Sequence, residues 1–210
     1  VLLLFPLLFP LFPFFFISCS IISLPLYSQT FFESRKDPVL IDVYNTSQIQ
    51  SLNLDSLKLY LYSKVPDLST LTPDNRKKKF IDLIFPAILI EKEKINTAYK
   101  YVFDNFTTIS PNEITQPLFD YCNCIDKYDL LLCLAEQPNS IIIAQAAIES
   151  GWGTSRFALE GNALFGQWTW SGDGIKPAGA ESDTKHKVMK FKVLKASVRA
   201  YQRNLNTHSS

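Results

Sequence analysis

The chain is poor in glycine, histidine and methionine, and its charges nearly cancel. Its 210 residues include seven Gly, two His and one Met, and 21 Lys and Arg stand against 20 Asp and Glu, which leaves a formal charge of +1. So small a charge excludes a strongly basic nucleic-acid binder and an acidic disordered tail. The scarcity of glycine excludes a collagen-like chain, and the sequence has no phosphate-binding glycine loop. We therefore expect no cofactor and no nucleic-acid partner.

Cysteine is also scarce, with four residues in the chain. Cys122 and Cys124 form a Cys-x-Cys pair, and Cys133 follows nine residues later. The histidines are His186 and His208, so no second pair of ligands completes a tetrahedral metal shell. We expect no metal site, and we interpret these cysteines as small buried side chains that could include one disulfide.

Charge is absent from the first 32 residues, and the first 16 consist only of Val, Leu, Phe and Pro. Prolines at this density interrupt a membrane-spanning helix, so residues 1–28 are interpreted as a signal-like leader that lacks the usual basic start. Cys19 ends a short stretch that loosely resembles a lipoprotein box, which leaves membrane attachment through this segment open. We expect an exported protein of the periplasm or cell envelope.

Helical patterns dominate the middle of the chain. Thr72 as an N-cap and Pro73 at the first helical position predict the start of a helix. Pro86 should bend or break this helix, after which the helical pattern continues to residue 106. A further helical stretch is predicted over residues 112–134.

Residues 138–150 form the most informative segment. They begin with Pro138 and are apolar on nearly all sides, which predicts a buried central helix. Gln145 and Glu149 are spaced i and i+4 and so share one face, and Gly151 can end the helix. We expect Glu149 to be partly buried at the negative end of the helix dipole, where ionisation is disfavoured, as a general acid requires. The alternative is a solvated Glu at a frayed helix end.

All seven Gly and all three Trp lie in the next segment, between residues 151 and 179. Glycine permits backbone conformations that other residues resist and lets a ligand approach closely. Indole rings offer flat surfaces on which sugars can stack. The functional site is therefore expected in this segment.

Three motifs carry a resemblance to a known family. Residues 144–158 read AQAAIESGWGTSRFA, residues 161–168 read GNALFGQW, and residues 197–208 read SVRAYQRNLNTH. Over roughly residues 62–208 the chain resembles the glucosaminidase family of bacterial cell-wall hydrolases, and specifically its Bax-type branch.

The resemblance implies a mainly α, α+β fold: a lysozyme-like helical domain with a small β-lobe. This domain would cover residues 62–210 and would be C-terminally truncated, with residues 29–61 as an N-terminal linker or extension. The implied function is hydrolysis of β-1,4 bonds after N-acetylglucosamine in peptidoglycan, so glycan strands are the expected partner. We expect the protein to be a monomer.

The resemblance also implies Glu149 as the catalytic acid and a second acidic residue in the β-lobe. Glu181 and Asp183 are the candidates, and we favour Glu181 as a base that activates water in an inverting reaction. Alternatively, the 2-acetamido group of the substrate attacks, which needs no second carboxylate. The sequence does not separate these two mechanisms.

Further side chains are expected to contact substrate through stacking or hydrogen bonds: Asn162, Phe165, Gln167, Trp168 and Trp170. Helical spacing alone places Tyr201 in the core, whereas the resemblance implies that its hydroxyl faces the cleft and steadies the reacting sugar. Trp152 is expected to pack in the core. A different class of function also fits the sequence, namely a catalytically silent glycan-binding or scaffolding module that kept the fold and lost the base.

Overall fold

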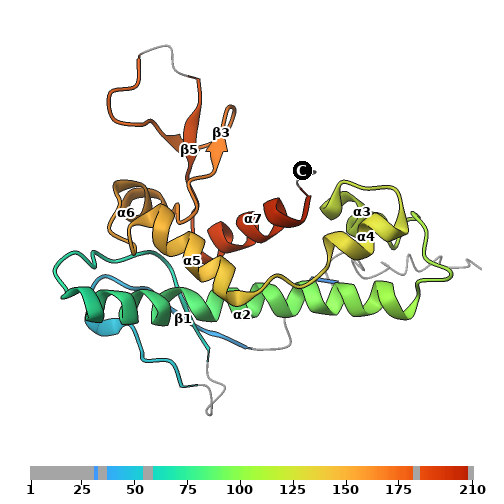
Figure 1. The fold of residues 1–210 in the computed structure, drawn as a ribbon, viewed down its shortest axis with the longest axis horizontal. Helices are drawn as coiled ribbons and strands as arrows, with labels where there is room; N and C mark the ends of the chain where they lie inside the picture. Colours follow the sequence, from blue (N-terminus) through green and yellow to red (C-terminus); the bar gives the residue numbers. More distant parts are fainter. Residues whose placement is uncertain (1–30, 33–36, 54–58, 182–184, 208–210) are drawn as a thin grey trace, which may run out of the picture.

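The computed structural model describes residues 31–32, 37–53, 59–181 and 185–207. A long helix, α2 (Pro73–Asp104), runs along the molecule, and α5 (Asn139–Ser150) and α7 (Leu194–Thr207) lie along one side of it (Figure 1). The strands are short, so the prediction of a mainly α fold with a small β part is confirmed. The lysozyme-like character of that fold stays a prediction.

Helix α2 begins where the sequence predicts, with Pro73 after the N-cap Thr72, but it does not end at Pro86. Proline removes one backbone hydrogen bond and crowds the preceding turn. Here Pro86 is itself buried, and buried residues on both sides of it hold the helix against the rest of the protein: Leu83, Ile84, Ala87 and Ile88. Of the predicted bend or break, the break is therefore wrong, because tertiary packing outweighs the local preference, and the bend stays a prediction.

The described residues form two core clusters along α2. The first joins the N-terminal half of α2 to α5, α7 and the strand β2 (Tyr60–Tyr62). Its fully buried members include Phe80, Leu83, Ile142 and Val198. This cluster fixes α5 and α7, which carry Glu149 and Tyr201.

The second cluster packs α3 (Gln116–Cys122) and α4 (Lys127–Cys133) against the C-terminal half of α2. One helical stretch over residues 112–134 was predicted, but Asn123 adopts a left-handed conformation with φ 51° and ends α3. Asp126 then caps α4 by accepting hydrogen bonds from two backbone N–H groups. A disulfide between Cys122 and Cys133 links the two helices, whereas Cys124 forms no disulfide with another described residue.

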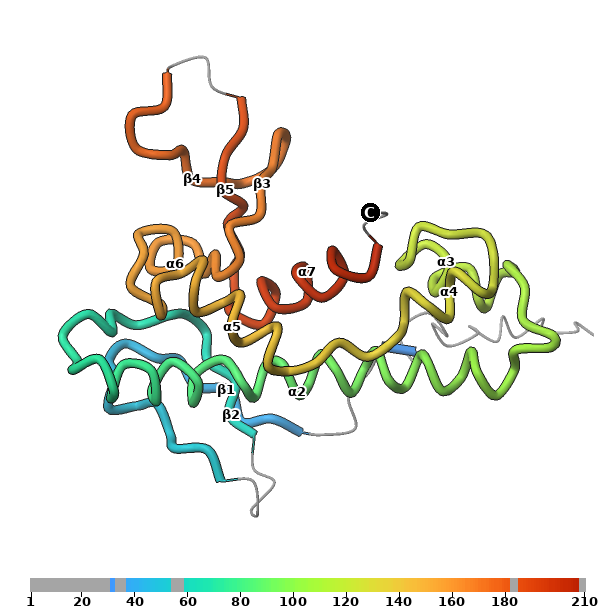
Figure 2. The backbone as a smooth tube through the Cα atoms, in the orientation of Figure 1, coloured from blue at the N-terminus to red at the C-terminus, as the bar shows by residue number. Residues whose placement is uncertain are grey.

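Two small sheets complete the part of the fold that the structure describes. β1 (Val39–Ile41) pairs with β2 in parallel, and η1 (Thr46–Gln48) lies between them in the sequence. The β-lobe is an antiparallel sheet of β3 (Trp168–Thr169), β5 (Lys187–Met189) and β4 (Gly174–Ile175), in that order. Figure 2 shows this lobe extending from the helices, with α6 (Arg156–Gly161) beside its base.

The described residues before residue 62 pack in both core clusters. Val43, Ile49 and Leu59 are buried in the first cluster, and Phe31 is buried in the second. The domain boundary at residue 62 stays a prediction. The predicted leader, residues 1–28, lies outside the described residues. Within the described part, no helix combines the length and apolar character needed to cross a membrane.

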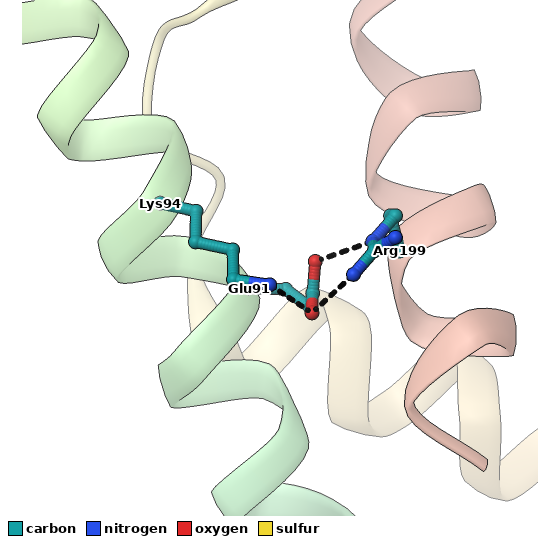
Figure 3. Close-up of polar contacts among 3 residues, drawn as sticks. All are labelled: Glu91, Lys94 and Arg199. Atoms are coloured by element: carbon teal, nitrogen blue, oxygen red, sulfur yellow. Dashed lines mark hydrogen bonds and ion pairs between the residues drawn. The ribbon is translucent and has the colours of Figure 1, made fainter. Parts of the chain in front are cut away.

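A buried carboxylate connects α2 to α7 (Figure 3). Glu91 on α2 is only 3% exposed. The guanidinium of Arg199 on α7 donates to both of its oxygens, with Nε at 2.8 Å from Oε2 and Nη2 at 3.3 Å from Oε1. Lys94 Nζ lies 3.2 Å from Oε1. This pairing holds α7 in register on α2.

Candidate active site

Helix α5 ends in a tight turn that directs the chain into the site. Gly151, Trp152 and Gly153 all have positive φ values, of 58°, 57° and 77°. The Ser150 hydroxyl donates to the Ala146 carbonyl at 2.6 Å and accepts from the Gly153 amide at 2.9 Å. A Cβ at Gly153 would lie 3.0 Å from the Phe80 ring, so this position requires glycine for both its conformation and its close packing.

Trp152 packs against the first core cluster, as predicted. Its ring meets Phe80 edge-on, with the ring centroids 5.7 Å apart. Phe80 belongs to α2, so the indole anchors the end of α5 to that helix.

Glu149 is exposed, which corrects the expected partial burial. The residues of α5 that are buried are Ile142, Ala146, Ala147 and Ser150, whereas Ile148 is 74% exposed. The helix is thus buried on one face and not on all sides. Glu149 lies on the exposed face, one turn beyond Gln145, which is also exposed.

The carboxylate of Glu149 lies next to the segment that follows α6. A Cβ built at Gly166 would be 3.2 Å from its Oε2 atom. Burial raises the pKa of the Tyr201 phenol, and the nearby Glu149 carboxylate raises it further. The acid predicted from α5 therefore lies close to Gly166 and to the phenol of α7.

A groove with a volume of about 470 Å³ is lined in part by Gly166, the neighbour of this carboxylate, although Glu149 itself is not among its lining residues. Its lining includes five of the side chains predicted from the sequence: Phe165, Gln167, Trp168, Trp170 and Tyr201. We call it the aromatic groove. The β-lobe supplies Trp168 and Trp170, and α7 supplies Tyr201. The loop between α6 and β3 supplies Phe165 and Gln167.

The aromatic rings of the groove are fixed to different extents. Phe165 and Tyr201 are stacked, with a centroid distance of 4.0 Å and an interplanar angle of 3°. Trp168 meets His186 edge-on at 4.8 Å. Trp168 and Trp170 are 45% and 72% exposed, so both indoles offer apolar faces to a ligand.

Gln167 links the two sides of the groove. Its backbone carbonyl accepts a hydrogen bond from the Met189 amide at 2.7 Å, which holds the segment to β5. Its side-chain Oε1 is buried, and no partner for it is found among the described residues. A buried acceptor without a donor costs about 1–3 kcal/mol, so this amide has an unmet need for a hydrogen-bond partner.

Asn162 forms hydrogen bonds within the protein, whereas the sequence predicts that it contacts substrate. It is 6% exposed and ends α6 in a left-handed conformation. Its Oδ1 accepts from the Val65 amide at 3.1 Å, and its Nδ2 donates to the carbonyls of Phe191 at 3.1 Å and Ser63 at 3.4 Å. The amide is therefore committed to joining three backbone segments, and we assign it a structural role.

The two candidates for a second acidic group lie in the connection between β4 and β5. Glu181 is exposed in the described part of that connection, which Figure 2 shows on the β-lobe away from the helices, and it does not line the aromatic groove. Asp183 lies outside the described residues. The described lining of the groove offers aromatic and amide groups and no carboxylate.

Three groove residues are absent from the predicted site: Gly166, Asn204 and Met189. Asn204 follows Tyr201 by three residues on α7, so helical periodicity could have placed both on one face. Met189 lies on β5, whose pairing with β3 brings it to the groove. The residues around Met189 in the sequence do not indicate which strand pairs with β5.

Comparison with known proteins finds relatives of the C-terminal part of the chain. Residues 134–210 match the glucosaminidase family, described as mannosyl-glycoprotein endo-beta-N-acetylglucosaminidase. The chain is also similar to the protein bax of Escherichia coli strain K12, with 41% identity over 71 residues. That match covers 34% of this chain and 24% of the relative, so the chain spans about a quarter of the relative's length. No solved structure matches. The resemblance to Bax-type glucosaminidases is thereby confirmed for this part of the chain.

Proposed function

We propose that this chain hydrolyses β-1,4 bonds after N-acetylglucosamine in peptidoglycan, with Glu149 as the general acid. The similarity of its C-terminal part to the glucosaminidase family supports this proposal. One observation carries the proposal: the Glu149 carboxylate lies against Gly166, at the edge of a groove lined by aromatic side chains. A sugar stacked in that groove would have its glycosidic oxygen within reach of a proton donor.

The exposure of Glu149 is compatible with an acid that becomes enclosed when the substrate binds. A glycan strand in the aromatic groove would exclude water from the carboxylate and disfavour its ionised form. The exposed faces of Trp168 and Trp170 provide stacking surfaces for such a strand. An acetamido N–H is a donor that could satisfy the amide oxygen of Gln167.

We assign the role of the second catalytic group to the 2-acetamido group of the substrate rather than to Glu181. Glu181 is exposed in a connection that extends from the β-lobe, whereas Tyr201 lies at the groove with its phenol protonated. A phenol O–H can hold the 2-acetamido group so that its oxygen attacks the anomeric carbon while Glu149 protonates the leaving oxygen. Water then attacks the anomeric carbon and releases the acetamido oxygen, while the Glu149 carboxylate accepts the proton of the water. Two such displacements retain the configuration at the anomeric carbon, whereas one direct attack by water inverts it.

The export of the protein is part of the proposal. Peptidoglycan lies outside the cytoplasm, and the Cys122–Cys133 disulfide fits an oxidising compartment. The N-terminal leader would direct this export and could also attach the protein to the membrane. We further propose that the protein acts as a monomer.

A catalytically silent glycan-binding module is the second candidate, and the exposure of Glu149 favours it. Such a module would use the same aromatic groove and would leave the glycan intact. Both candidates predict that the protein binds isolated cell-wall sacculi.

Incubation of purified protein with sacculi distinguishes the two candidates. For a glucosaminidase we expect soluble fragments whose new reducing ends are N-acetylglucosamine, identified by borohydride reduction and mass spectrometry. Binding to sacculi without release of reducing ends would support the silent module and contradict the hydrolase.

Substitution of Gly166 by Ala should impair hydrolysis more than it impairs folding. Gly166 has φ 60°, and the added Cβ would lie 3.2 Å from Glu149 Oε2, so the carboxylate must move. A left-handed alanine costs about 1–2 kcal/mol. The carboxylate has to give by only a few tenths of an ångström, so the loss of rate should be measurable but smaller than the about 100-fold that a 1 Å misplacement can cost.

Gly179 provides a matched control for this substitution. It has φ 75°, and a Cβ there would meet nothing within 4 Å. Gly179→Ala should therefore lower the melting temperature to a similar extent but keep the wild-type rate of reducing-end release. Equal rates for both variants would show that Gly166 does not position Glu149.

A further inference from the structure

A second hollow continues the aromatic groove along α7. It has a volume of about 520 Å³, and it shares Gln167, Met189 and Asn204 with the aromatic groove. Its floor is one face of α7, formed by residues at helical spacing: Ala196, Arg199, Ala200, Arg203 and Thr207. Tyr121 and Asn123, at the end of α3, form the opposite wall. We call this part the arginine end of the groove.

Both guanidinium groups of the arginine end are held in place. Arg199 is bound through Nε and Nη2 to the buried carboxylate of Glu91. Arg203 donates from Nε to the Tyr121 carbonyl at 2.9 Å and from Nη2 to the Asp120 carbonyl at 3.2 Å. Its guanidinium carbon lies 5.3 Å from the centre of the Tyr121 ring. Within the described residues, Nη1 of neither arginine is engaged.

Positive charge is in excess at this end. Lys94 and Arg199 share the single carboxylate of Glu91, and Arg203 binds backbone carbonyls rather than a carboxylate. Burial lowers the pKa of Lys195, and the Lys94 and Arg199 cations nearby lower it further, although Glu91 acts in the opposite direction. The side chain of Asp120 accepts a hydrogen bond from Gln116. The balance of charge favours an anion.

We propose that the arginine end binds carboxylate groups carried by the glycan strand. The proposal rests on the proposed function, because it concerns which kind of glycan strand is the substrate of the reaction at the aromatic groove. A guanidinium fixed through Nε and Nη2 presents its remaining N–H groups as charge-assisted donors for a carboxylate. Tyr121 adds a neutral donor, since burial raises the pKa of its phenol to about 12. Peptidoglycan carries such carboxylates on its lactyl groups and peptide stems, whereas chitin carries none.

Binding of defined glycans to the Glu149→Gln protein tests the proposal without turnover of the ligand. Three probes are compared by calorimetry: neutral chitotetraose, the disaccharide of N-acetylglucosamine and N-acetylmuramic acid with its free lactyl carboxylate, and the same disaccharide bearing a peptide stem. We expect Arg203→Gln to weaken binding of at least one acidic probe by about tenfold, the loss of one charge-assisted hydrogen bond. Binding of chitotetraose should change by less than about twofold, because its contacts are stacking contacts. The acidic probe that is affected identifies the source of the carboxylate.

Lys100→Gln is the matched control, because it removes one positive charge from an exposed pair with Asp104 on α2. It should leave the binding of all three probes unchanged, and melting curves verify that both variants fold. An equal loss for neutral and acidic probes on Arg203→Gln would overturn the inference, since it would show a structural role. Failure of every probe to bind the Glu149→Gln protein with Arg203 intact would instead contradict the proposed function itself.

Discussion

Arg199→Met is expected to lower the free energy of unfolding by about 2 kcal/mol. Removing one partner of a fully buried ion pair leaves the other charge without compensation, which typically costs about 3–5 kcal/mol. Glu91 is 3% exposed, but the Arg199 side chain is 51% exposed and Glu91 would keep Lys94, so the expected loss falls below this range. Urea denaturation followed by circular dichroism measures the change.

Two further variants test this explanation. The double variant of Glu91→Met with Arg199→Met should be more stable than Arg199→Met alone, because it removes the uncompensated carboxylate together with its partner. Lys100→Met breaks an exposed pair with Asp104 and should change stability by less than about 1 kcal/mol. If Arg199→Met were as mild as Lys100→Met, the Glu91–Arg199 contact would not hold α7 on α2.

The sequence was sufficient to place α2, α5 and most of the side chains of the groove. Pro73 marked the start of α2, and the apolar run after Pro138 marked α5. The clustering of tryptophan and glycine after Gly151 identified the segment that supplies the aromatic groove. These features depend on local spacing and composition, which a single sequence records directly.

The errors concern contacts between residues that are distant in the sequence. Asn162 has the chemistry of a sugar-binding amide, but its partners Val65 and Ser63 lie almost a hundred residues away. Pro86 would break an isolated helix, but its buried neighbours keep α2 continuous. The composition of α5 does not show which of its faces is exposed, because burial depends on which elements pack against each side.

Glu149→Gln is expected to reduce the rate of glycan cleavage by about 100- to 10,000-fold, the usual contribution of a general acid. The amide keeps the size and polarity of the side chain but cannot donate a proton to the leaving oxygen. Because Glu149 is exposed on α5, the substitution should leave stability within about 0.5 kcal/mol of the wild type. Binding to sacculi should be retained, since the aromatic groove is unchanged.

Glu181→Gln is the control for the mechanism. If the acetamido group of the substrate is the nucleophile, this variant should keep wild-type activity within about twofold, and the first product should retain the β configuration by proton NMR. A large loss of activity together with inversion would identify Glu181 as the base.

The most direct test of the account compares the wild-type protein with Glu149→Gln in one assay, the release of N-acetylglucosamine reducing ends from sacculi. The account predicts steady release by the wild type and almost none by the variant, with equal amounts of both proteins bound to the sacculi. Full activity of the Glu149→Gln protein would contradict the assignment of Glu149 as the acid.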